Sequence, residues 1–204
     1  YINYPIIGRE GEYLTIATTR PETIPGDTAV AVNPKDERYG KLVGEKILLP
    51  IMNREIPIIA DDYVDTEFGT GAVKITPAHD PNDYEMSLRQ NLEAIVVIDK
   101  DGIMTKESGR YEGQERYECR KNIVKDLDEL GLLVKIEDCP HSVGHCQRCG
   151  EPIEALISTQ WFVKMEPLLK AATDCVKDGR TQFVPERFTK YDKLCLILRD
   201  IKNG

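Results

Sequence analysis

The first half of the chain alternates short apolar runs with glycine and proline, a pattern typical of a β-rich fold. Residues 13–18 alternate bulky and small side chains at period two, which predicts a strand. Further strands are predicted at 28–33, 46–49, 55–60 and 72–76, with Gly or Pro in the gaps between them. The low contrast along these runs indicates strands that are buried on both faces.

Two helices are predicted among these strands. The first begins at Asp80, which suits the N-cap, with Pro81 at the first helical position and Asp83 near N3. The second spans roughly residues 116–130, before a glycine that favours a helix end. Two more strands are expected at 94–98 and 132–136.

Several short strands, tight turns and two helices predict an α+β fold, with a closed or nearly closed β-barrel and the helices packed outside it. We expect this barrel over residues 1–138. The sequence changes character at Cys139, so residues 139–204 are expected to form a C-terminal junction. This junction would hold a Cys-x-x-Cys knuckle, a helix over about 166–177 and an atypical tail.

Charge and composition exclude some classes of function. The chain of 204 residues has 41% hydrophobic and 30% charged residues, which is ordinary for a globular soluble protein. No run approaches the ~20 apolar residues of a membrane span, and no signal peptide opens the chain, so no membrane association is expected. The net charge of -8 argues against a broad nucleic-acid groove, but it is compatible with a local grip on a nucleic-acid end.

The six cysteines all lie in the second half of the chain, so the first half must be held by its own core. This distribution favours a reducing, cytoplasmic location over a disulfide framework. Cys146 and Cys149 form half of a zinc ribbon, and Cys139, His141 or His145 would complete four ligands locally. The alternatives are a partner pair outside this sequence, or a turn without metal. We expect no cofactor, with zinc at the Cys-x-x-Cys pair as the less favoured reading.

A short stretch between residues 74 and 83 concentrates the polar chemistry. It holds an ammonium, a hydroxyl, an imidazole and two carboxylates, from Lys74, Thr76, His79, Asp80 and Asp83. The stretch closes one predicted strand and opens the first predicted helix. Polar groups held at such a corner are typical of a small-ligand site. Lys74 lies in an apolar run, and a buried lysine requires a partner.

Three stretches, residues 18–32, 69–85 and 160–165, together resemble the editing insertion of class I valyl-tRNA synthetases. The leucyl and isoleucyl relatives share the threonine-rich stretch and the last aspartate, but differ around Pro21 and after Lys74. The resemblance runs to about Lys190, and residues 191–204 depart from the family pattern. The nucleotide-binding signatures of the synthetic site are absent. The chain is therefore expected to be an excised domain that does not activate amino acids.

The resemblance implies hydrolysis of threonine wrongly attached to the valine tRNA, within a barrel-like editing fold. It implies the aminoacyl-tRNA 3′ end as partner, with threonyl-adenylate as a further candidate substrate and the remainder of the synthetase lying outside this chain. Three alternatives stay open. The chain would otherwise be a non-catalytic module that binds the tRNA acceptor end, a zinc-knuckle connector, or the editing domain of a leucyl or isoleucyl relative.

The resemblance also implies site residues. It assigns Asp83 to the α-ammonium of the substrate, although helix capping alone would also explain this residue. Capping is the stronger alternative for Asp80. Lys74, Thr76 and Asp80 are polar enough, and close enough in sequence, to bind the hydroxyl that valine lacks. His79 would orient water or make a structural hydrogen bond.

The threonine-rich stretch supplies the remaining candidates. Thr18, Thr19 and Thr23 would line the wall beside the aminoacyl ester, although β-propensity also explains them, Thr18 above all. Arg20 would contact the ester or the terminal phosphate, or else form a surface ion pair. No Ser-His-Asp or Cys-His set is identified, so we expect direct attack by a positioned water.

Overall fold

The computed structural model describes residues 1–189 and divides the chain into two compact units. The first unit is Tyr1–Ile157, and the second begins at Ser158. The predicted boundary after Asp138 stays a prediction, but residues 139–157 belong to the first unit. The atypical tail that the sequence predicts over residues 191–204 lies outside the described residues.

The described residues form six strands in two sheets. In the smaller sheet, β1 (Ile2–Pro5) pairs antiparallel with β2 (Tyr13–Ile16). The larger sheet has the order β4-β5-β3-β6, in which β3 pairs parallel with β5 and antiparallel with β6. Its strands are β3 (Ala29–Val32), β4 (Lys46–Leu49), β5 (Arg54–Ala60) and β6 (Ala72–Ile75).

The predicted α+β class is confirmed, but the two sheets do not close into a barrel within residues 1–189. β1 meets β4 through a single bridge between Ile6 and Ile47, and β2 packs near β6 without a ladder. Most of these strands have only four residues. Gly8, at φ 84°, turns the chain away directly after the bridge. The hydrogen-bonded pairing between β1 and β4 therefore stays a single bridge, and the two sheets remain separate.

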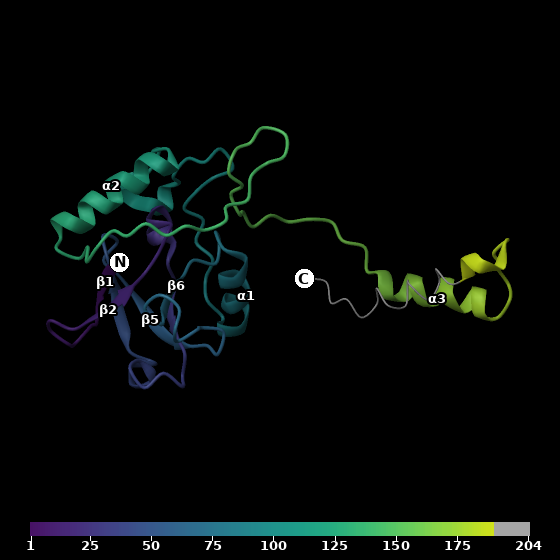
Figure 1. Cartoon of the computed structure of the whole chain (residues 1–204), viewed down its shortest axis with the longest axis horizontal. Helices are drawn as coiled ribbons and strands as arrows, with labels where there is room; N and C mark the ends of the chain where they lie inside the picture. The colour runs from purple at the N-terminus through teal and green to yellow at the C-terminus, as the bar shows by residue number, and fades with distance from the viewer. Residues whose placement is uncertain (190–204) are drawn as a thin grey trace. The chain divides into compact units, whose positions relative to one another are not determined.

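The apolar sequence of β3 reflects burial on both faces, as predicted. Ala29 and Ala31 pack with Met86 of α1 (Pro81–Gln90), whereas Val30 and Val32 belong to the larger core. That core receives the inner face of α2 (Arg116–Glu129), through Cys119, Ile123 and Leu127. Figure 1 shows α1 and α2 against different sides of the strands.

Both predicted helices form where the sequence places them. Asp80 caps α1, because its Oδ1 accepts the backbone N–H groups of Asn82 at 2.8 Å and Asp83 at 3.1 Å. The helix ends at Asn91, which adopts the left-handed conformation at φ 52°. The remaining helices are η1 (Pro21–Gly26), η2 (Gly40–Leu42), η3 (Lys106–Tyr111), α3 (Met165–Lys177) and η4 (Glu186–Thr189).

The strands predicted at 94–98 and 132–136 are not regular strands. Each makes an isolated bridge, Ile98 with Met104 and Leu133 with Ile2. In the first segment, two backbone N–H groups bond to a histidine side chain instead of a neighbouring strand. A side chain thus replaces part of the expected ladder. None of the helices in residues 1–189 is long and apolar enough to cross a membrane.

Candidate functional site

The ammonium of Lys74 lies inside the fold, where all of its donors are used. Its Nζ donates to Thr23 Oγ1 at 2.8 Å, Asp27 Oδ1 at 3.0 Å and Thr76 Oγ1 at 2.5 Å. A lysine has three donors, so these bonds saturate it. The sequence correctly predicts that this lysine needs a partner, but the partner, Asp27, was missed. The signal was a carboxylate directly before the apolar run at 28–33.

Asp27 is the centre of this buried polar cluster. Its carboxylate has no exposed surface, and it also accepts the hydroxyls of Thr76 at 2.5 Å and Tyr4 at 2.8 Å. Burial raises the pKa of Asp27 above its usual range, against the opposing effect of Lys74. The Thr23 hydroxyl is also engaged, because it donates to the Arg20 carbonyl at 2.9 Å. The cluster therefore satisfies itself and holds the end of β6 in place.

Asp83, at the third position of α1, is connected to this cluster through the backbone of Thr76. Its Oδ2 accepts the backbone N–H of Thr76 at 2.8 Å. Within the described residues, Oδ1 has no hydrogen-bond partner. Burial raises the pKa of Asp83 to about 6. The strand end thus orients one carboxylate oxygen of Asp83, and the other has no partner among the described residues.

A cavity of about 320 Å³ opens beside the start of α1. Phe68, which is 76% exposed, and Tyr63, which is 63% exposed, place two aromatic rings at this cavity. The sequence reasoning missed both, although Phe68 directly precedes the glycine-rich turn at 69–71. The lining consists of Tyr63, Val64, Asp65, Phe68, Val73, Asp80, Asn82, Asp83 and Met86. Polar groups of the helix start therefore face apolar and aromatic walls.

His79 makes the structural hydrogen bond that the sequence left as one of two readings. Its buried Nε2 accepts the backbone N–H groups of Val97 at 2.9 Å and Ile98 at 3.2 Å. The ring proton of the neutral form therefore sits on Nδ1. Burial lowers the pKa of His79 to about 4, so the ring is neutral near pH 7. The accepting nitrogen is occupied and has no free lone pair for a water molecule.

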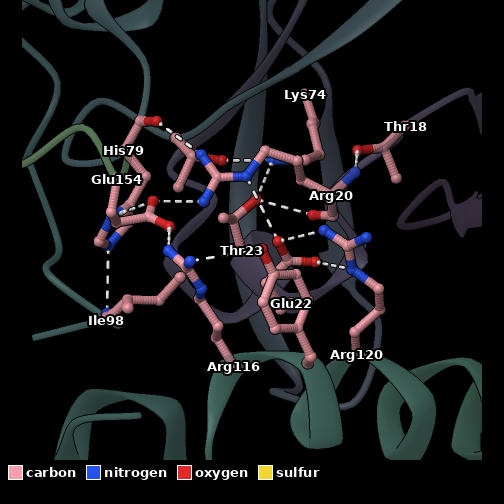
Figure 2. A network of polar contacts seen from close by, with 12 residues as sticks. Thr18, Arg20, Glu22, Thr23, Lys74, His79, Ile98, Arg116, Arg120 and Glu154 are labelled. Atoms are coloured by element: carbon pink, nitrogen blue, oxygen red, sulfur yellow. Dashed lines mark hydrogen bonds and ion pairs between the residues drawn. The ribbon is translucent and has the colours of Figure 1, made fainter. Parts of the chain in front are cut away.

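Arg20 joins the loop after β2 to the loop before α1 (Figure 2). It donates to the His79 carbonyl at 3.1 Å, to Glu22 at 3.3 Å and to Glu154. Its own backbone N–H bonds to Thr18 Oγ1 at 3.0 Å. Thr19 is exposed and makes no hydrogen bond within the described residues.

The predicted site residues thus fall into three groups and one exception. Thr23, Lys74 and Thr76 meet in the buried cluster, and Asp80 and Asp83 meet at the cavity. Hydrogen bonds from Arg20 to the Thr18 hydroxyl and to the His79 carbonyl bring these three residues together. Thr19 stands apart from these contacts.

The Cys-x-x-Cys turn offers two of the four ligands of a zinc site. Backbone hydrogen bonds from Cys149 and Arg148 lower the pKa of Cys146, which favours a thiolate. Ring nitrogens of His141 and His145 contact backbone carbonyl groups at 3.0 and 2.7 Å. In residues 1–189, no three His, Cys, Asp or Glu side chains are placed to share one ion. A complete zinc site would need ligands from elsewhere.

Comparison with known sequences points to one group of enzymes. The family model described as "Leucyl-tRNA synthetase, editing domain" matches residues 33–128. The valine–tRNA ligase of Carboxydothermus hydrogenoformans is 61% identical over 190 residues, which is 93% of this chain and 22% of that protein. The corresponding ligase of Staphylococcus carnosus is 58% identical over 189 residues, 92% of this chain and 22% of its own length. The chain spans about a fifth of the length of these curated relatives.

Solved structures show the same fold. The first is the ternary complex of Agrobacterium radiobacter K84 agnB2 LeuRS with tRNA and LeuAMS, with a TM-score of 0.54 and 18% identity. The match covers 76% of this chain and 23% of that one. The second, GlLeuRS-CP1, has a TM-score of 0.51 and 16% identity, over 63% of this chain and 85% of that one.

Proposed function

The chain belongs to the editing domains of class I valyl-tRNA synthetases, and we propose that it hydrolyses threonine from mischarged valine tRNA. The identity to valine–tRNA ligases supports the valyl assignment over the leucyl and isoleucyl alternatives. The tRNA in the complex of the leucyl relative supports tRNA as a ligand, and we propose that its aminoacylated 3′ end is the part that binds here. Threonyl-adenylate, which carries the same amino acid, is a second proposed substrate.

The observation that carries this proposal is that Asp83 lines the cavity while only one of its carboxylate oxygens has a hydrogen-bond partner within the described residues. The α-ammonium of an aminoacyl ester needs an anionic partner, and Asp83 offers one whose other oxygen is already fixed on the Thr76 N–H. At pH 7 this carboxylate is mostly ionised, because its pKa is about 6. We therefore assign the ammonium to Asp83, as the resemblance implies.

Discrimination by the substrate hydroxyl is the second part of the proposal. An apolar synthetic pocket rejects threonine by only ~10², a value known for valyl-tRNA synthetases rather than derived from this structure. A site whose polar groups are left unpaired by valine can discriminate further, at about 1–3 kcal/mol for each group. The polar residues Asp80, Asn82 and Asp83 line the cavity beside apolar Val73 and Met86. This mixture suits a small side chain with one hydroxyl.

Lys74 and Thr76 fit this scheme best as positioning groups. Their polar atoms already bond to Asp27 and to each other, so a direct bond to the substrate hydroxyl would require one internal bond to be exchanged. Their cluster holds the end of β6, and the Thr76 N–H at that end orients Asp83. We propose that they act on the substrate through Asp83.

The chemical step in this proposal is attack by a positioned water. The ribose ester is labile, so no covalent nucleophile is required. The Nε2 of His79 is bonded to two backbone N–H groups, which makes it unsuited to accept a proton from that water. The protein instead fixes the ammonium and the ester, and the terminal ribose hydroxyl of the tRNA assists.

The mouth of the cavity suits the terminal nucleoside of the tRNA. Phe68 and Tyr63 are exposed aromatic rings, on which a base can stack. The net charge of -8 makes tight binding of a whole tRNA by this chain alone unfavourable. Affinity for tRNA would then come mainly from other parts of a longer cytoplasmic synthetase.

A deacylation assay tests the function. The chain is incubated at high concentration with valine tRNA carrying labelled threonine, and in parallel with the same tRNA carrying valine. We expect faster release of threonine than of valine. A chain that binds the acceptor end without turnover would release neither above the uncatalysed rate, and this outcome would reject the enzyme in favour of the binding module.

A further inference from the structure

Glu154 links the segment after the Cys-x-x-Cys turn to the loops that carry the site. Its side chain is only 13% exposed, and each carboxylate oxygen accepts from a different guanidinium. Oε1 bonds to Arg20, and Oε2 lies 2.6 Å from Nη1 of Arg116, at the start of α2. One side chain from residues 139–157 therefore ties together two elements that are distant in sequence (Figure 2).

The same carboxylate faces the loop before α1. Its Oε1 lies 3.9 Å from Nδ1 of His79, the nitrogen that carries the ring proton. Arg20, held by this oxygen, donates to the backbone carbonyl of His79, which directly precedes the N-cap of α1. Glu154 thus fixes an arginine at the start of the helix that presents Asp83.

The ion pairs around Arg20 show why its contact with Glu154 matters for its position. Three guanidinium groups, of Arg20, Arg116 and Arg120, share the carboxylates of Glu22 and Glu154. Glu22 is bound bidentately by Arg120, with both contacts at 2.8 Å, whereas its contact with Arg20 is 3.3 Å. Without Glu154, Arg20 would keep only the weaker of its two carboxylate partners.

We propose that Glu154 is a positioning residue of the editing site, which acts by holding Arg20 against the start of α1. This inference rests on the proposed function. Glu154 is not among the residues that line the cavity, so the segment after the Cys-x-x-Cys turn contributes to the geometry of a site it does not line. Arg20 is 33% exposed and remains able to meet the ester or the terminal phosphate.

The test uses Glu154→Gln, which keeps the shape and removes the charge. Its matched control is Glu151→Gln, because Glu151 is exposed in the same segment and its side chain makes no hydrogen bond or ion pair within the described residues. Single-turnover hydrolysis of threonyl-tRNA is measured against protein concentration, together with thermal unfolding. We expect Glu154→Gln to raise the half-saturating concentration on the order of tenfold, with a smaller change in the maximal rate. Glu151→Gln should match wild type.

Arg20→Ala separates positioning from a general structural role. If Glu154 acts through Arg20, adding Glu154→Gln to the Arg20→Ala variant should raise the half-saturating concentration by less than about twofold. Equal effects of Glu154→Gln in both backgrounds would overturn the proposal. A folded Glu154→Gln variant with the half-saturating concentration of the wild type would also overturn the proposal.

A second readout is independent of catalysis. The guanidinium resonances of Arg20 in the ¹⁵N-labelled chain should move in Glu154→Gln and stay in place in Glu151→Gln. Unchanged Arg20 resonances in Glu154→Gln would overturn the contact itself. A wild-type chain that fails to hydrolyse threonyl-tRNA would instead overturn the proposed function, and these resonances would then decide the contact alone.

Discussion

The Nζ of Lys74 lies 3.0 Å from Oδ1 of Asp27, and the two side chains are 10% and 0% exposed. This buried pair lies where β6 meets the start of β3, and hydroxyls of Thr23 and Thr76 complete it. Because it fixes the end of β6, it also fixes the Thr76 N–H that orients Asp83. The stability of the fold and the geometry of the cavity therefore depend on the same ion pair.

Removing the ammonium should destabilise the fold strongly. In Lys74→Met, the Asp27 carboxylate stays buried without its cation, and breaking such a pair typically costs about 3–5 kcal/mol. Chemical denaturation at pH 7 measures this loss. The control is Lys46→Met, since Lys46 pairs with Glu55 at 2.8 Å on the surface, with both side chains more than half exposed. That change should cost less than about 1 kcal/mol. Equal losses in the two variants would contradict a closed polar cluster.

His79 should be structural as well as buried. In His79→Leu, the backbone N–H groups of Val97 and Ile98 lose their acceptor, and each unpaired group costs about 1–3 kcal/mol. Urea denaturation of the variant checks the loss. A variant as stable as wild type would show that these groups find other partners.

The same variant should show a pH signature. The folded His79 has a pKa of about 4, below the usual 6.5, so the unfolded chain takes up this proton first as the pH falls. Its contribution to stability is complete above about pH 6.5 and decreases toward pH 4. The difference in unfolding free energy between wild type and His79→Leu should shrink from pH 7 to pH 5. A difference independent of pH would contradict a neutral, buried ring.

Asp83 should give hydrolysis an acidic limb. Its carboxyl has a pKa of about 6 in the fold, and only the ionised form pairs with an ammonium. We expect the rate of threonyl-tRNA hydrolysis, corrected for uncatalysed loss, to rise through pH 6 and level off above about pH 7. The sign for stability is opposite, because the folded state holds this proton more tightly than the unfolded chain. Ionisation between about pH 4 and 6 therefore costs stability. A flat rate profile from pH 5 to 7 would contradict the assignment.

Phe68 should bind the end of the tRNA. Stacking of one base on an aromatic ring is worth about 1–3 kcal/mol, so Phe68→Ala should raise the half-saturating concentration about 5- to 160-fold. Phe68 is 76% exposed, so the thermal unfolding midpoint should change little. Val43→Ala serves as an exposed apolar control away from the cavity. Equal saturation by the two variants would exclude stacking at this ring.

The sequence predicts the positions of the helices better than the pairing between the strands. Asp80 and Pro81 define the start of α1 through local rules, and the structure has it at that position. Closure of the barrel depends on how far the ladder extends beyond Ile6, which no local pattern encodes. The segment at 94–98 reads as a strand because it is apolar, yet its N–H groups bond to a side chain eighteen residues away.

The candidate site shows the same limit. The corner at residues 74–83 stands out from its residue types, and the requirement for a partner of Lys74 follows from burial. The identity of that partner, Asp27, depends on strand pairing between β3 and β6. No local sequence pattern relates Glu154 to a residue 134 positions earlier, so only the tertiary contacts reveal its link to Arg20.

The most direct test of the central claim is the rate of threonyl-tRNA hydrolysis by Asp83→Asn. Asparagine keeps an oxygen for the Thr76 N–H, so the fold should survive while the anion is lost. Asp62→Asn, a surface aspartate that is 71% exposed, controls for the change in net charge. We predict a loss on the order of 10² for Asp83→Asn and a wild-type rate for Asp62→Asn. A wild-type rate in folded Asp83→Asn would contradict the assignment of the substrate ammonium to Asp83.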